Sequence, residues 1–149
     1  MFCSDVSSDD IDDDYENFSF DISSLTTCDK LPKESEMGNI EYKRYLKDLA
    51  EDRIEHLSTQ MKWRVIDGRG EAIYIIGVDD DGIIYGLDKY ELKISLRNIK
   101  KMAKIINCRV ISVDLIRNNE KLFTKVCIID NKLMELPSEG KKYIYKIKI

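Results

Sequence analysis

The sequence predicts an α+β domain with the element order β-α-β-β-α-β-β-β, in which two helices pack on a mixed or antiparallel sheet. Residues 72–78 form an almost unbroken apolar run of strand-forming residues, which is typical of a strand covered on both faces. Residues 50–67 and 88–107 instead repeat their apolar positions at helical spacing. Beyond them, short alternating segments predict further strands.

The first strand and the first helix precede that apolar run. Residues 38–46, with Ile40 and Tyr42 as apolar positions, predict a strand. The helix over residues 50–67 is expected to end at Gly68, in the position that favours a left-handed cap. Its predicted buried stripe consists of Ile54, Leu57, Met61 and Val65.

The centre of the predicted sheet is a hairpin. After the strand over residues 72–78, the sequence Asp-Asp-Asp-Gly supplies a tight turn, because Gly82 tolerates the positive φ that hairpin turns require. Residues 83–87 then return as a second strand. We therefore expect a central hairpin with acidic groups at its tip.

The second helix and the C-terminal strands complete the predicted fold. Asp88 and Glu91 have the spacing of a capping box, so the helix is expected to begin there and to run to about residue 107. Its apolar stripe comprises Leu92, Leu96, Ile99, Met102, Ala103 and Ile106. Strands are predicted over residues 108–116, 122–129 and 143–149.

Charge divides the chain into two parts. Residues 1–36 contain eleven acidic residues against two lysines, a net charge of −9. Since the whole chain of 149 residues carries −4, residues 37–149 carry +5. This composition predicts a disordered acidic tail over residues 1–36, joined to a single mildly basic domain over residues 37–149.

Composition also argues against several classes of protein. Four scattered cysteines and one histidine provide no recognisable zinc site or disulfide framework, which favours reduced intracellular thiols. No apolar stretch approaches the ~20 residues of a membrane span, so we expect a soluble cytoplasmic protein with no membrane contact. The phosphate-binding motif G-x-x-x-x-G-K-[ST] is absent, which excludes GTP binding by that loop.

One side of the first helix and the residues that follow it mix cationic and planar side chains. Cations neutralise phosphates, and aromatic or guanidinium planes stack on unpaired bases. We therefore predict RNA contact here, although a solvated helix face with Trp63 partly in the core is the alternative. The predicted contact residues are Arg53, His56, Gln60, Lys62, Trp63, Arg64 and Arg69. The acidic tail is expected to compete with RNA for this surface.

The carboxylates suggest a second possible activity, metal-dependent cleavage of a phosphodiester. Glu36 and Glu41 bracket the first strand, and Asp79, Asp80 and Asp81 follow the strand over residues 72–78. If the two strands are neighbours, these acids converge, and convergent carboxylates hold Mg²⁺ or Mn²⁺, which activates water against a phosphodiester. The alternative is ordinary turn chemistry at the aspartates and a solvated Glu41.

Four segments resemble a known family. Residues 38–43, 55–64, 68–78 and 95–103 are similar, in order and spacing, to the region before the G domain in translational GTPases of the GTP-binding protein one/two family. The resemblance covers roughly residues 36–116. Those relatives are elongation-factor-like GTPases linked to translation, ribosome stalling and RNA turnover.

Because the G domain is absent from this sequence, the resemblance implies no GTPase activity here. It implies instead a binding module without a cofactor, associated with RNA (tRNA or rRNA) or the ribosome. The alternative is a protein-interaction domain that docks on a separate GTPase or a ribosomal partner.

A second likeness is to the Schlafen-type core. In this sequence it rests on Glu36, Glu41 and Asp79, whose spacing is similar to that of the acidic trio in nuclease-active members. Only half of the doubled Schlafen core fits in this chain, so the likeness implies a half-core. The function that it implies is a metal-dependent endoribonuclease using these three acids with Mg²⁺ or Mn²⁺.

Overall fold

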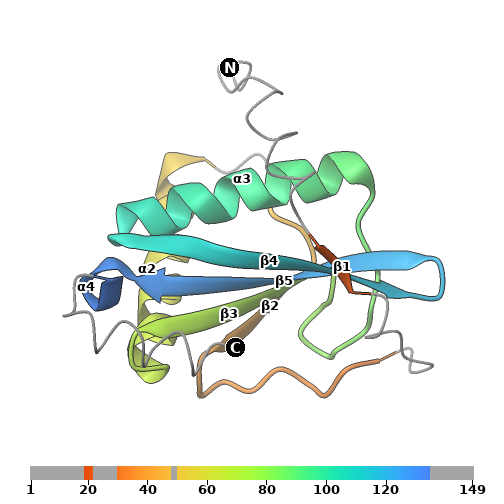
Figure 1. Cartoon of the computed structure of the whole chain (residues 1–149), viewed down its shortest axis with the longest axis horizontal. Coiled ribbons are helices and arrows are strands. Elements are labelled where there is room, and N and C mark those ends of the chain that lie inside the picture. Colours follow the sequence, from red (N-terminus) through yellow and green to blue (C-terminus); the bar gives the residue numbers. More distant parts are fainter. Residues whose placement is uncertain (1–18, 22–29, 48–49, 135–149) are drawn as a thin grey trace.

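The computed structural model describes residues 19–21, 30–47 and 50–134 (Figure 1). The predicted α+β class is confirmed, with strands and helices in a mixed order along the chain. The elements are β1 (Ser19–Asp21), β2 (Ile40–Lys43), α2 (Glu51–Asp67), β3 (Glu71–Ile76), α3 (Lys89–Ile105), β4 (Cys108–Asn118), β5 (Lys121–Asp130) and α4 (Asn131–Met134).

The strands form one five-stranded sheet in the order β1-β4-β5-β3-β2. The central pairs β3/β5 and β4/β5 are antiparallel, whereas β2 runs parallel to β3 and β1 runs parallel to β4. The sheet is therefore mixed, one of the two predicted arrangements. β3 lies between β2 and β5, so both of its edges are paired, and its residues alternate between fully buried and half-buried positions.

The main core lies between one face of the sheet and the helices α2 and α3. Side chains Ala72, Tyr74 and Ile76 of β3 alternate toward this core, which they share with side chains of both helices and of β4 and β5. Figure 1 shows α3 running along the length of the sheet beside β4. No helix in the described part of the chain is long and apolar enough to cross a membrane.

A smaller core occupies the other face of the sheet. It contains the buried side chains of Tyr42, Val78, Ile84 and Phe123, with Leu31 packed against them. These residues come from β2, β5 and two loops. This second core therefore packs the segment before β2 and the loop after β3 against the sheet.

Both long helices occur where the sequence predicts them. The capping box at the start of α3 is confirmed: the Asp88 carboxylate accepts a hydrogen bond from the Glu91 amide at 2.7 Å, and the Glu91 carboxylate accepts one from the Asp88 amide at 2.9 Å. The predicted left-handed cap at Gly68 is wrong, since its φ is −91° and the left-handed residue is Arg69. Glycine is needed at position 68 because a Cβ there would lie 1.8 Å from the Glu71 carbonyl oxygen.

The predicted central hairpin forms only in its turn, where Gly82 has φ of +89° and its amide donates to the Asp79 carbonyl at 2.9 Å, and the predicted second strand is wrong. Residues 83–87 form no strand and contribute only isolated bridges, Val78 with Ile84 and Lys30 with Ile83. The physical reason is that β2 and β5 already occupy both edges of β3. Gly77, with φ of 107°, turns the chain away from the sheet. Its carbonyl oxygen accepts hydrogen bonds from the amides of Tyr85 and Gly86.

The described fold begins before residue 37, where the sequence analysis placed the domain boundary. β1 pairs with residues 114–116 of β4, although it lies within the predicted tail. Residues 30–36 also contact the domain: the Leu31 amide donates to the Gly82 carbonyl at 2.7 Å, and the Glu34 amide donates to the Asp80 carbonyl at 2.8 Å. The predicted final strand over residues 143–149 lies outside the described residues.

Candidate nucleic-acid interface

Helix α2 and the turn after it leave most of the predicted RNA-contact side chains at the surface. Trp63 is the largest of them, with 63% of its surface exposed. The other exposed members are Arg53, His56, Lys62 and Arg69. Core packing therefore does not account for these five side chains, and they remain available to a ligand.

The structure removes Arg64 from this predicted surface, because only 7% of Arg64 is exposed. Its position along α2 places it on the inward side of the helix, next to the buried Met61 and Val65. Gln60 is half-buried, and its Oε1 atom is buried without a hydrogen-bond partner in the described structure. The prediction of Arg64 as an RNA contact is thus corrected by its burial.

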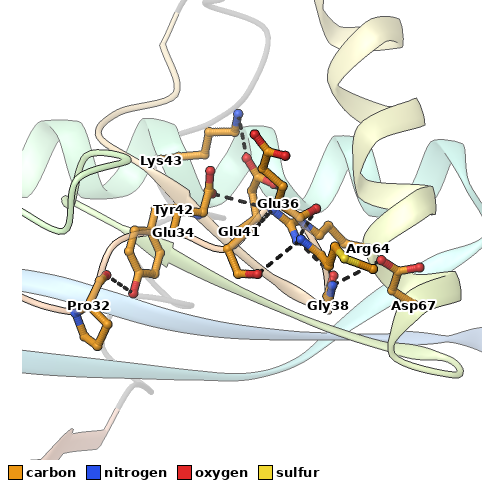
Figure 2. A network of polar contacts seen from close by, with 11 residues as sticks. Pro32, Glu34, Glu36, Gly38, Glu41, Tyr42, Lys43, Arg64 and Asp67 are labelled. Carbon is orange, nitrogen blue, oxygen red and sulfur yellow. Dashed lines mark hydrogen bonds and ion pairs between the residues drawn. The ribbon is translucent and has the colours of Figure 1, made fainter.

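Arg64 instead joins α2 to β2 and to the segment before it (Figure 2). Its Nε atom donates a hydrogen bond of 2.8 Å to the Glu41 carboxylate, whose residue is 4% exposed. Its Nη atoms donate to the carbonyl oxygens of Gly38 and Ser35, each at 2.9 Å. One guanidinium therefore satisfies a buried carboxylate and two backbone acceptors.

A second acid and a second cation complete this ion network. The other Glu41 oxygen lies 3.1 Å from Lys43 Nζ, and the Glu34 carboxylate lies 3.9 Å from an Arg64 Nη atom. Glu34 also accepts a hydrogen bond of 2.6 Å from the Tyr42 amide, and burial raises its pKa. Two carboxylates thus face two cations, and this balance makes their burial tolerable.

The three acids of the predicted nuclease site have different surroundings and different partners. Glu36 is exposed, while Glu41 belongs to the ion network. Asp79 accepts hydrogen bonds from the amides of Asp81 and Ile83, at 3.0 and 2.9 Å, which is the turn chemistry considered as the alternative. No group of three or more acidic, histidine or cysteine residues in residues 19–21, 30–47 and 50–134 is placed to hold a metal ion.

A hollow that sequence reasoning missed lies where the C-terminal ends of α2 and α3 meet. Lys62 and Ile66 of α2 line it together with Ile106 and Cys108 after α3 and Lys132 of α4. Burial raises the pKa of the Cys108 thiol to about 11, so this cysteine is a poor nucleophile at neutral pH. No local sequence signal predicts the hollow, because its residues come from three distant segments.

These features define a small α+β domain whose helix α2 exposes a tryptophan and several cations. Its sequence is 49% identical to GTP-binding protein 2 of Mus musculus over 80 residues, which are 54% of this chain and 13% of that protein. It is 33% identical to GTP-binding protein 1 of Xenopus laevis over 75 residues, or 50% of this chain and 11% of that protein. These matches confirm the resemblance to the GTP-binding protein one/two family.

A viral relative matches more of the chain. An uncharacterized protein of Acanthamoeba polyphaga mimivirus is 39% identical over 105 residues, which are 70% of this chain and 56% of that protein. No protein-family model matches the chain. The chain therefore spans a small fraction of the GTP-binding proteins and about half of the viral one.

Proposed function

We propose that this domain is an RNA- or ribosome-associated binding module, equivalent to the region before the G domain in GTP-binding protein one/two-type GTPases, and that it has no GTPase activity of its own. The similarity to GTP-binding proteins 2 and 1 supports a related role. The sequence contains no G-x-x-x-x-G-K-[ST] motif, which supports the second part of the proposal.

The observation that carries this proposal is the exposure of Trp63. An indole buries a large apolar area when it finds a partner, yet 63% of this residue faces solvent. Lys62 precedes it in the sequence, and Arg53 and His56 are exposed on the same helix. An exposed aromatic plane beside cations suits unpaired bases, which stack on the ring while the cations meet their phosphates.

Replacing Trp63 by alanine is expected to weaken RNA binding with little effect on folding. Stacking of one base on an aromatic side chain contributes about 1–3 kcal/mol, so affinity should fall roughly 5- to 150-fold. Fluorescence anisotropy with tRNA and with an unstructured oligoribonucleotide measures this change. Met37→Ala is the matched control, because Met37 is also large, apolar and exposed, at 80%. Undetectable RNA binding by the unmodified protein would contradict the proposal.

Removing residues 1–18 is expected to strengthen RNA binding at low salt. This segment carries seven acidic residues and no lysine or arginine, so it competes with phosphates for the exposed cations of the folded domain. The difference from the full chain should shrink as salt rises, because screening weakens both interactions. Removal of residues 1–36 is unsuitable, since Glu34 and Ser35 belong to the network around Arg64.

A chain in which the seven acids are replaced by their amides is the control for segment length. It should behave like the shortened chain. Equal RNA affinity in all three proteins at every salt concentration would show that the acidic segment does not compete.

We do not propose the Schlafen-like endoribonuclease. Both Glu41 oxygens form ion pairs, with Arg64 and with Lys43, and Asp79 accepts amide hydrogen bonds within its own turn. A metal at these acids would require Glu41 to give up two cations in a buried position, which is unfavourable.

A further inference from the structure

Helix α3 is far more cationic than helix α2. It carries six lysines and arginines against one acid, Glu91, whose carboxylate accepts a hydrogen bond in the capping box. Helix α2 carries three cations, one of which is the buried Arg64, against four acids. The positive charge that a phosphate chain requires is therefore concentrated on α3.

Five of the α3 cations form a line along one side of the helix. They recur every three or four residues, which places them within a quarter of the helix circumference. We call them the α3 stripe: Lys89, Lys93, Arg97, Lys100 and Lys104. From first to last the stripe extends over roughly 22 Å, at 1.5 Å per residue.

The stripe is exposed at both ends and half-buried in the middle, where the Arg97 Nε atom is buried without a hydrogen-bond partner in the described structure. Lys89 and Lys104 at its ends are exposed, and the three members between them are partly exposed. The core lies on another side of the helix, where Leu92, Ile99 and Met102 are fully buried. A row of cations with this exposure favours a polyanion over an isolated phosphate group.

The structure also indicates whether the α3 stripe suits an anionic membrane or a nucleic acid. A helix that lies on an anionic membrane inserts its apolar face, but the apolar face of α3 is already in the core. The large exposed apolar side chains of α3, Tyr90 and Ile105, stand at opposite ends of the helix. A chain of phosphates needs no apolar insertion and follows a line of cations directly.

The C-terminal ends of α2 and α3 lie close together, but this does not join the stripe to the proposed base-binding surface. Ile66 of α2 and Ile106, just beyond α3, line the same hollow, so the C-terminal ends of the two helices are neighbours. Lys104 is two residues before Ile106, and Trp63 is one helical turn before Ile66. Residues two apart on a helix point to nearly opposite sides, so Lys104 and Ile106 face different ways and the stripe is a surface distinct from that around Trp63.

We propose that the α3 stripe is a phosphate-binding track for an RNA strand. This inference rests on the proposed RNA-binding function and adds the surface that supplies its electrostatic part. The variant Lys93→Gln/Lys100→Gln/Lys104→Gln tests it, because glutamine keeps a similar helix propensity while removing three charges. The matched control is Lys33→Gln/Lys47→Gln/Lys125→Gln, which removes three exposed lysines outside α3.

The measurement is the affinity for an unstructured oligoribonucleotide as a function of salt. Each phosphate contact on a single strand contributes about 0.7 to the slope of log affinity against log salt. The stripe variant should therefore lose about 2 in slope magnitude and bind more weakly at low salt, with the control close to the unmodified protein. Thermal unfolding verifies that the variants fold. If the stripe variant does not fold, the single variant Lys104→Gln replaces it, because Lys104 is exposed. Its slope of log affinity against log salt should be smaller in magnitude by about 0.7.

The outcomes distinguish the proposed RNA-binding function from the proposed role of the α3 stripe. No RNA binding by the unmodified protein overturns the proposed function and this inference together. RNA binding that is equal in the stripe and control variants overturns this inference alone, and so does binding to phosphatidylserine vesicles in preference to RNA. A reduced slope confined to the stripe variant supports both.

Discussion

Replacing Arg64 by alanine is expected to lower the free energy of unfolding by about 3–5 kcal/mol, the range measured when one partner of a buried ion pair is removed. The side chains of Arg64 and Glu41 are 9% and 5% exposed, so solvent cannot substitute for the lost guanidinium. The carbonyls of Gly38 and Ser35 would lose their donors as well. Urea unfolding followed by circular dichroism measures the change.

Arg53→Ala provides the control on the same helix. Arg53 is exposed, so its replacement removes the same charge from α2 but should change stability by no more than about 0.5 kcal/mol. Arg64→Lys should lie between the two, because it keeps the charge but loses the planar set of donors. Similar stability losses in Arg53→Ala and Arg64→Ala would contradict the structural role assigned to Arg64.

Replacing Gly82 by alanine is expected to cost about 2–5 kcal/mol of stability. Gly82 has φ of +89°, and left-handed backbone costs other residues about 1–2 kcal/mol. In addition, a Cβ at this position would lie 2.1 Å from the Leu31 carbonyl oxygen and 2.9 Å from that of Pro32. Both are backbone atoms, so relief of the clash requires residues 31 and 32 to move, at about 1–3 kcal/mol more.

Gly38→Ala separates these two contributions. Gly38 has a similar φ of +95°, but a Cβ there would meet nothing within 4 Å. It should therefore show the backbone penalty alone, and the excess loss in Gly82→Ala should report the clash with residues 31 and 32. Equal losses in the two variants, measured by the same unfolding experiment, would show that the contact between the two loops does not stabilise the fold.

The local elements were predictable because their signals are local. The α2 and α3 spans follow from apolar residues at helical spacing, and the start of α3 follows from the spacing of Asp88 and Glu91. Four of the predicted RNA-contact side chains, those of Arg53, His56, Lys62 and Trp63, are exposed because helix periodicity places them away from the buried stripe.

The errors arose where a residue's partner lies far away in the sequence. An apolar run followed by Asp-Asp-Asp-Gly predicts a hairpin, but the partners of β3 are β2, about 30 residues earlier, and β5, about 50 residues later. In the sequence, nothing distinguishes Arg64 from an exposed cation on a helix. Only the placement of Glu41 beneath α2 shows that it is a structural ion pair rather than an RNA contact.

The helices, the capping box and the α+β class follow from the sequence, because periodicity and hydrogen-bonding side chains act within a few residues. Only the folded structure shows the strand order, the burial of Arg64 and the fact that Glu36, Glu41 and Asp79 form no metal-holding group among the described residues. Those outcomes depend on which distant segments share a sheet edge or a desolvated space, and a buried charge is stable only where the fold brings its counter-charge within reach.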